Sequence, residues 1–236
     1  MINVTIYNEF HHEKVNEKVS AIYPNGIHKA IGELLSVDAE FNIRYATLED
    51  IAETLTDEIL DTTDVLFWWG HVKHHEVPDA VVEKVCQRVY DGMGFIPVHS
   101  GHFSKPFKKL MGMSCNLKWR ETEDKERIWA IEPYHPIAYG VPEYFDIPHE
   151  ETYGERFDIP TPEDVIFIGN FSGGEVFRSG ITYHRGLGKI FYFQPGHETY
   201  PIYHMPVVGT ILRNAARWCY TPKTATPYTL GFWEKR

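Results

Sequence analysis

Histidine is the residue type whose number and placement in this sequence point to chemistry. The chain has 13 histidines among 236 residues. Many of them follow a short apolar run, which is the pattern that a buried strand leaves before a loop. Neutral imidazoles can hold zinc or a similar divalent ion, and a histidine near neutral pH can act as a general acid or base. The histidines at or near such strand exits are His11, His12, His71, His74, His75, His99, His102, His197 and His204.

No single stretch of the chain carries a complete catalytic motif. In the stretch His71–Glu76 the glutamate comes last, and Pro78 places the stretch ahead of a predicted helix. It therefore differs from the H-E-x-x-H arrangement of zinc proteases. Serine hydrolysis fits poorly, because Ser100 lacks the two glycines of a G-x-S-x-G turn. A centre would have to form from separate loops.

Strand and helix patterns alternate over the first hundred residues. The apolar run Val65–Trp69 is typical of a strand buried on both faces, and Phe95–Val98 is predicted to follow as the fourth strand. Between them Pro78 opens an amphipathic helix, which ends near Gly92. This alternation indicates βαβ units and a parallel sheet. Ligands of such sheets bind beyond the carboxyl ends of the strands, where these histidines are expected.

The second half of the chain shows a less regular pattern. Residues 114–132 are predicted to form a hairpin around the charged turn Glu121–Lys125, and residues 133–163 to be irregular with short strands. No repeat or low-complexity linker divides the chain, so we expect one domain over residues 1–236 with an elaborated C-terminal half. The later elements are expected at Val165–Gly169 and Lys189–Phe193, as strands, and at Val207–Tyr220, as a closing helix.

The composition argues against several classes of protein. Lysine and arginine number 23 against 33 aspartates and glutamates, a net charge of −10, so a nucleic-acid partner is not expected. No apolar run approaches the ~18 residues of a membrane span, and Met1–Tyr7 is too short and polar for a signal peptide. Cys86, Cys115 and Cys219 are an odd number without metal-type spacing. We therefore expect a reduced, soluble, cytoplasmic protein.

Aromatic residues near the polar strand exits favour a carbohydrate as the small-molecule partner. A sugar has an apolar face and a hydroxyl edge, which flat rings combined with His, Glu, Asn and Arg suit. Trp68 lies inside a predicted buried strand, so its indole could instead belong to the core. A lone arginine such as Arg178 is usually half of a surface ion pair. The aromatic residues concerned are Trp68, Trp69, Trp119, Tyr200 and Tyr203.

Four strings follow one another along the chain: Trp68–His71, His99–Ser104, Gly174–Gly180 and Pro195–Tyr200. Together they resemble the ThuA-like, trehalose-utilisation family, and the match runs from the first strand to the closing helix. The resemblance implies an α/β fold, namely the three-layer, flavodoxin-like architecture of the class I glutamine amidotransferase-like superfamily. That architecture has a central, mostly parallel sheet.

The same resemblance bears on activity. The superfamily has a G-x-C-x-G turn, and alignment puts His99 in the place of its cysteine. The later His-x-Glu pair is best matched by His197 with Glu198 adjacent. Without a cysteine no covalent glutamyl intermediate forms, so glutaminase activity is not expected. The family name points to disaccharide catabolism and implies a metal-assisted enzyme that moves a proton beside the carbonyl of a keto-sugar or glycoside.

The expected centre consists of His71, His99 and His197, which would hold a divalent metal, with zinc the first candidate. His99, His197 and Glu9 are the catalytic candidates, with Glu9 as carboxylate partner or base. Metal ligation and proton transfer compete for the same side chains, and both interpretations stay open. The expected substrate-binding residues are Glu175, Arg178, Trp69 and Tyr200. The alternative is a non-catalytic carbohydrate-binding or regulatory module that keeps the crevice, and a homo-oligomer is left open in either case.

Overall fold

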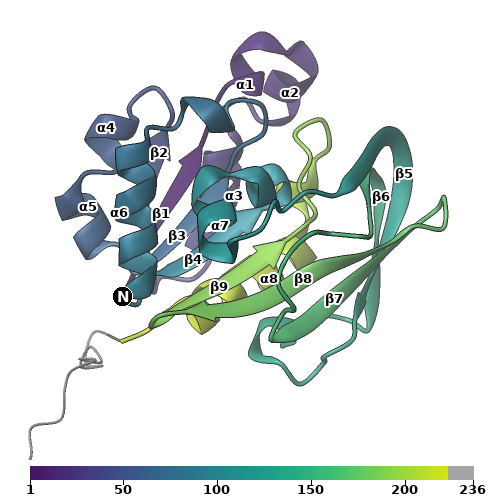
Figure 1. Cartoon of the computed structure of the whole chain (residues 1–236). Helices are drawn as coiled ribbons and strands as arrows, with labels where there is room; N and C mark the ends of the chain where they lie inside the picture. The colour runs from purple at the N-terminus through teal and green to yellow at the C-terminus, as the bar shows by residue number, and fades with distance from the viewer. Residues whose placement is uncertain (223–236) are drawn as a thin grey trace, which may run out of the picture.

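Nine strands of the chain join into one sheet in a computed structural model that describes residues 1–222. Figure 1 shows the sheet with helices on both faces. The strands are β1 (Ile2–Asn8), β2 (Phe41–Thr47), β3 (Val65–Trp69), β4 (Gly94–Val98), β5 (Lys118–Ala130), β6 (Tyr144–Gly154), β7 (Asp164–Phe171), β8 (Val176–Arg185) and β9 (Gly188–Phe193). The helices are α1 (His12–Val15), α2 (Glu17–Ile22), α3 (Ile27–Ser36), α4 (Ile51–Thr54), α5 (Asp57–Thr62), α6 (Asp79–Tyr90), α7 (Lys105–Met111) and α8 (Pro206–Cys219). Short 3₁₀ turns span His74–Glu76, His99–Phe103, Pro136–Ala138 and Ile202–His204.

The strand order separates a parallel part of the sheet from an antiparallel part. The order is β2-β1-β3-β4-β9-β8-β7-β5-β6. Neighbours from β2 to β9 pair in parallel, and neighbours from β9 to β6 pair antiparallel. The parallel part has the 2-1-3-4-5 arrangement of flavodoxin-like folds, whose ligands bind beyond the strand ends where the order reverses. The predicted α/β fold with a central parallel sheet is confirmed, and the elaborated second half supplies the antiparallel strands.

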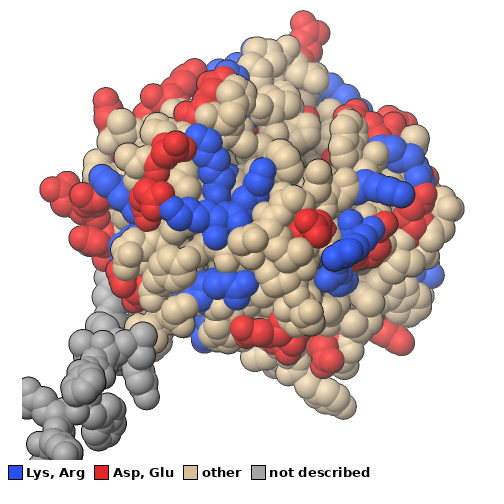
Figure 2. Space-filling view, in the orientation of Figure 1, with Lys and Arg blue, Asp and Glu red and all other residues tan. Residues whose placement is uncertain are grey.

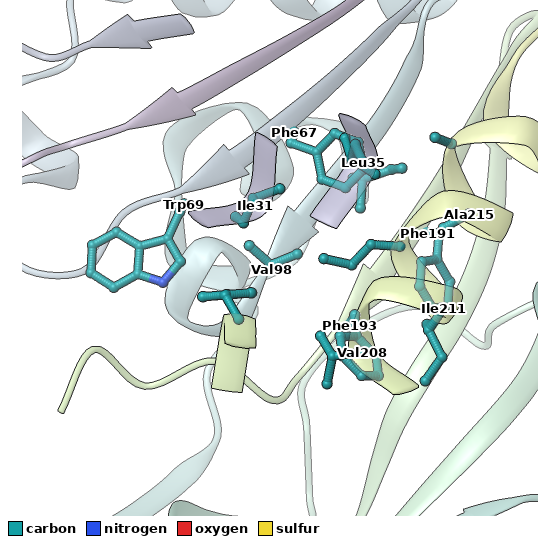
Figure 3. Packing of buried hydrophobic residues seen from close by; sticks show 14 of the residues in the cluster. Ile31, Leu35, Phe67, Trp69, Val98, Phe191, Phe193, Val208, Ile211 and Ala215 are labelled. Carbon is teal, nitrogen blue, oxygen red and sulfur yellow. The ribbon is translucent and has the colours of Figure 1, made fainter. Parts of the chain in front are cut away.

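Two apolar clusters, one on each face of the sheet, make the fold three layers thick. On one face α3 and α8 pack against the sheet; Ile31, Val208 and Ile211 of these helices belong to one buried cluster with Phe191 and Phe193 of β9, and Figure 3 shows Val208 and Ile211 beside these two rings. On the other face α6 and α7 cover residues from the same strands. Because both faces are covered, all five residues of β3 and of β4 are buried, as the continuous apolar runs predicted.

Two predictions for the second half were wrong. Residues 118–130 form one strand, β5, and the charged stretch Glu121–Lys125 continues it through an irregularity instead of turning. Most side chains of this stretch face solvent, so their charges are compatible with a strand. Within the segment expected to be irregular, Tyr144–Gly154 forms the long strand β6. Pro148 is tolerated there because β6 is at the edge of the sheet.

The surface carries charges of both signs. On the face shown in Figure 2, lysine and arginine side chains lie among aspartates and glutamates. Several of these charges pair, for example Lys105 with Asp79 at 2.7 Å. Among the described residues, we find no helix with the length and apolar character needed to span a bilayer.

Candidate functional site

The register of the parallel strands brings their carboxyl ends to one level. Asn8 of β1 pairs with Trp69 of β3, Trp69 pairs with Val98 of β4, and Val98 pairs with Phe193 of β9. The residues that follow these four ends therefore meet at one edge of the sheet. That edge is where ligands of open α/β sheets bind.

His99 occupies a strained turn at the end of β4. Its backbone φ is +50°, in the left-handed region that residues other than glycine seldom adopt, and His99 is the first residue of a 3₁₀ turn. The imidazole is completely buried. Strain of this kind concentrates at functional sites, where the surrounding structure holds it in place.

Four side chains from separate loops and strands converge at this edge. His71, His99, Glu151 and His197 each offer one nitrogen or carboxylate oxygen, and these atoms lie within 4.8 Å of one another. We call them the four-residue group. Nε2 of His99 is 3.1 Å from Oε2 of Glu151, and Nε2 of His197 is 4.0 Å from the same oxygen. The structure thus brings together the three histidines that the sequence singled out.

The donor set of the four-residue group fits a divalent cation. Nδ1 of His71 and Nε2 of His197 are buried, yet neither makes a hydrogen bond to any described residue. Unpaired polar atoms are costly inside a protein, and a bound ion would satisfy them. Zinc takes imidazole nitrogens and carboxylate oxygens at about 2.0–2.2 Å, so small side-chain rotations would close this group onto one ion.

Hydrogen bonds behind the group orient two of its rings. Nδ1 of His99 is 3.0 Å from the carbonyl oxygen of Gln194, so Nδ1 donates, and Nε2 is directed at Oε2 of Glu151, 3.1 Å away. Nδ1 of His197 lies 2.8 Å from the hydroxyl of Thr199 and 3.3 Å from its amide nitrogen. Donation to the hydroxyl frees Nε2 for a metal, whereas acceptance from the amide leaves the proton on Nε2. Partners of this kind select the tautomer of a ligating histidine.

Electrostatics leave the group with neutral and charged members. Burial lowers the pKa of His71 and lowers that of His197 to about 4, so both are neutral at pH 7. Burial also acts to lower the pKa of His99, but the nearby carboxylates outweigh it and raise the pKa to about 9. Although burial opposes ionisation of Glu151, the adjacent histidines lower its pKa. Neutral imidazoles and an ionised carboxylate are the forms that bind divalent metals, so His71, His197 and Glu151 are ready to bind, whereas His99 would release a proton as a metal binds.

Two other buried glutamates hold the loops that carry the histidines. Oε2 of Glu9 accepts from the backbone N–H of His71 at 2.7 Å and of Lys73 at 3.0 Å, and Oε1 accepts from Val72 at 3.0 Å. Glu9 therefore lies behind the loop and outside the four-residue group, and its expected role as a base stays a prediction.

Glu150 holds the loop after β9, which carries His197, by accepting hydrogen bonds from its backbone. It accepts from the backbone N–H of Gly196 at 2.8 Å and of His197 at 3.2 Å, and burial raises its pKa to about 7. These bonds also show that β6, the last strand in the sheet order, curls back over the ends of the parallel strands.

A cavity of about 400 Å³ opens beside the four-residue group. His71 and Glu151 line it, and so do Trp119 and Glu121 of β5 and Tyr153 of β6. The Trp119 side chain is exposed, so a flat apolar ring is available at the cavity wall. The cavity is large enough for a small organic ligand in contact with the four-residue group.

The expected substrate-binding residues are divided between the site and its surroundings. The ring of Tyr200 is 5.5 Å from that of His197, centroid to centroid. Trp69 is fully buried and its Nε1 donates to the carbonyl oxygen of Gly196 at 3.1 Å, so it supports the His197 loop.

Glu175 and Arg178 have other partners. A nitrogen of the Arg120 guanidinium is 2.8 Å from Glu175, and Arg178 donates to both oxygens of Glu155 at 2.7 and 2.9 Å. Neither Glu175 nor Arg178 lines the cavity. Their expected contact with substrate stays a prediction.

Sequence reasoning missed the carboxylates of β6. Glu151 and Glu150 lie in a proline-containing segment that was expected to be irregular. The available signal was the string Glu150–Tyr153, in which β-prone residues follow two adjacent glutamates. His12 is expected at a strand exit and Glu198 follows His197, but neither is predicted to belong to the centre, and the structure places both against His71.

Comparison with known proteins agrees with this architecture. The family model described as trehalose utilisation, ThuA, matches residues 3–219. A solved structure described as a ThuA-like protein from Parabacteroides merdae is 14% identical, has a TM-score of 0.69, and covers 92% of this chain and 89% of its own. A ThuA-like protein from Bacteroides uniformis is 17% identical with a TM-score of 0.67, covering 96% and 94%.

The fold also matches part of a larger enzyme. A β-galactosidase from Bacillus circulans sp. alkalophilus is 12% identical with a TM-score of 0.54, covering 94% of this chain but 32% of that one. No curated protein matches the chain. Since the family model spans nearly all of the described residues, this chain belongs to the ThuA, trehalose-utilisation family.

Proposed function

We propose that this protein is a metal-dependent enzyme that acts on a keto-sugar or glycoside by acid–base chemistry. The observation that carries the proposal is the four-residue group, which faces a ligand-sized cavity at the edge where α/β sheets bind their ligands. The carbohydrate comes from the family's description as trehalose utilisation and from the exposed Trp119 beside the cavity. A cytoplasmic location and a homo-oligomeric state remain predictions.

His71, His99 and His197 would hold the ion, for which zinc is the first candidate by its preference for imidazole nitrogens. A bound divalent ion polarises a carbonyl or hydroxyl oxygen. Glu151 has one oxygen, Oε2, toward His99 and His197 and also lines the cavity. It can therefore accept a proton from a sugar carbon beside the carbonyl, which is the role expected of Glu9 from the sequence. The protonated Glu151 can then return that proton to the sugar, because Nε2 of His197, 4.0 Å from the same oxygen, would be bound to the ion.

A glutaminase is not proposed, because the nucleophile that such an enzyme needs is absent from the turn. Cys86, Cys115 and Cys219 are buried on other parts of the chain, and burial raises the pKa of each thiol. The hydroxyl of Ser100 donates to the carbonyl oxygen of Gly70 at 2.9 Å. Thiolate chemistry would require an ionised, accessible cysteine.

The test combines metal analysis with a proton-exchange assay on the full chain. Elemental analysis should find divalent metal in the wild type, and His99→Ala should lose it while circular dichroism shows the fold retained. Incubation with keto-sugars in D₂O, followed by mass spectrometry, should show deuterium entering beside the carbonyl. Glu151→Gln should reduce that incorporation at least tenfold. Because His75 is exposed and lies outside the four-residue group, His75→Ala is the matched control. Metal-free protein that still processes a sugar would contradict the metal-dependent mechanism.

A carbohydrate-binding module without catalysis is the second candidate. Its support is the β-galactosidase match, in which a similar fold makes up about a third of a larger chain. This candidate predicts saturable sugar binding by calorimetry without any product or deuterium incorporation after long incubation. Turnover that disappears in His197→Ala would exclude it.

A further inference from the structure

A second set of potential metal ligands adjoins the four-residue group. His12, His71 and Glu198 each offer one ligand atom, and these atoms lie within 4.8 Å of one another. We call them the three-residue group. Nδ1 of His12 is 2.8 Å from Oε1 of Glu198, and Nδ1 of His71 is 3.5 Å from the same oxygen. His12 starts α1 just after β1, and Glu198 follows His197 in the loop after β9, so both occupy the same edge of the sheet.

The two groups are joined by His71 and by the carboxylate of Glu198. His71 belongs to both groups, but a neutral imidazole has a single nitrogen lone pair and ligates one cation, and its unpaired Nδ1 lies beside Oε1 of Glu198. The carboxylate of Glu198 directs Oε1 toward His12 and His71, while Oε2 lies 3.7 Å from Nε2 of His197. Each carboxylate oxygen has its own lone pairs, so one carboxylate can contact two cations.

Burial leaves this carboxylate short of partners. Glu198 is buried, and its Oε2 makes no hydrogen bond to any described residue. The contact with His12 engages only Oε1, so an ion pair between these two side chains does not account for the second oxygen. A buried ionised carboxylate needs compensation at both oxygens, which cations on both sides would provide.

We propose that this protein binds two adjacent divalent cations, one held by His99 and His197 of the four-residue group and one held by His12 and His71, with the carboxylate of Glu198 bridging them. The proposal rests on the proposed function, because the first cation is the one in the four-residue group. Paired cations are a recurring arrangement in enzymes that orient two oxygen atoms of one substrate. A sugar with neighbouring carbonyl and hydroxyl oxygens is such a substrate.

Metal stoichiometry tests the proposal directly. The full chain is stripped with a chelator and titrated with Zn²⁺ by calorimetry, and with Mn²⁺ followed by electron paramagnetic resonance. The wild type should bind two equivalents and give the spectrum of a coupled manganese pair. His12→Ala and Glu198→Gln should each bind one equivalent, with the coupled signal lost. His75→Ala should behave like the wild type, since the His75 side chain is 78% exposed and belongs to neither group.

The outcomes separate this proposal from the proposed function. One equivalent in the wild type, unchanged in His12→Ala, would overturn the second cation alone and leave His12 and Glu198 as an ion pair behind a single metal. No binding in the wild type would overturn both. Circular dichroism of each variant establishes that lost binding reflects lost ligands. Because His12 is partly exposed in a four-residue helix, His12→Ala is expected to fold.

Discussion

Four buried glutamates at the site have two different roles, and the groups that surround each carboxylate determine its role. Glu9 and Glu150 are surrounded by backbone N–H groups, whose dipoles compensate the buried carboxylate. Glu151 and Glu198 face imidazole rings and keep oxygens directed at other potential ligands. The first pair positions loops, and the second pair supplies the donor atoms that our proposals use. Residue type alone does not distinguish these roles.

Glu9→Gln tests the positioning role at this scale. Glutamine has one acceptor oxygen and would turn an NH₂ group toward backbone donors, so the loop that carries His71 should lose its fixed geometry. We expect zinc affinity to fall by roughly 10–100-fold, the range found when groups that orient ligands are removed. The free energy of unfolding should fall by about 1–3 kcal/mol. Calorimetry and urea unfolding measure the two effects. Glu49→Gln, at an exposed side chain, is the control, and unchanged zinc affinity in Glu9→Gln would contradict the role.

Among the elements, the antiparallel pair β5–β6 completes the site. Successive side chains of a strand alternate between faces, so residues two apart share a face. Trp119 and Glu121 of β5, with Glu151 and Tyr153 of β6, meet this spacing and line the cavity. In the register of the two strands Trp119 pairs with Tyr153. The parallel strands thus supply histidines, and this pair supplies a carboxylate and an aromatic wall.

Trp119→Ala tests the role of this wall. Removal of the exposed ring should weaken carbohydrate binding about tenfold, or ~1.4 kcal/mol, because stacking contact with the apolar face of a sugar is lost. Zinc content should not change, since Trp119 is outside both metal-ligand groups. Calorimetric titration with the best-binding sugar measures the effect. Tyr134→Ala, at a side chain that is 97% exposed elsewhere on the surface, should bind sugar like the wild type. Equal affinity in Trp119→Ala would exclude the stacking role.

In the molecule as a whole, the two apolar clusters hold the sheet between layers of helices. Some polar side chains are buried together with these clusters. His28 of α3 is one of these groups, and its Nδ1 is 3.1 Å from the amide nitrogen of Asn8. An amide N–H can only donate, so Nδ1 accepts this bond in the neutral ring. Burial lowers the pKa of His28 to about 4. In the unfolded chain the ring should titrate near its ordinary pKa, about 6.5.

This difference predicts how stability depends on pH. Between pH 6.5 and 4 the unfolded chain binds a proton that the folded protein excludes, so the free energy of unfolding should fall as the pH drops through this window. The contribution is complete above pH 6.5 and should be reduced by roughly 1–3 kcal/mol at pH 4. Urea unfolding of metal-free protein at several pH values measures it.

His28→Gln is the variant for this measurement, because its amide oxygen can still accept from Asn8. Its pH slope should be shallower than that of the wild type by up to one proton. His75→Gln, at an exposed ring, should keep the wild-type slope. Equal slopes for His28→Gln and the wild type would show that His28 does not carry the effect.

The sequence by itself determined the parallel part of the fold and the histidines at its edge. Continuous apolar runs such as Val65–Trp69 require burial on both faces, and the residues that follow them must then emerge at the carboxyl ends of the strands. For this reason nine histidines are expected at this edge, and the family resemblance selects His71, His99 and His197 from them. Strand propensity and apolar pattern are local properties, so they can be read from neighbouring residues.

Only the tertiary structure decided which carboxylates face these histidines. Glu151 reaches them because β6 pairs with β5 and curls over the ends of β4 and β9, although its own sequence is polar and interrupted by Pro148. Glu9 holds the loop that carries His71 by accepting hydrogen bonds from backbone N–H groups more than sixty residues along the chain. Such contacts depend on the pairing of segments that are distant in the sequence, and a local sequence pattern does not predict that pairing.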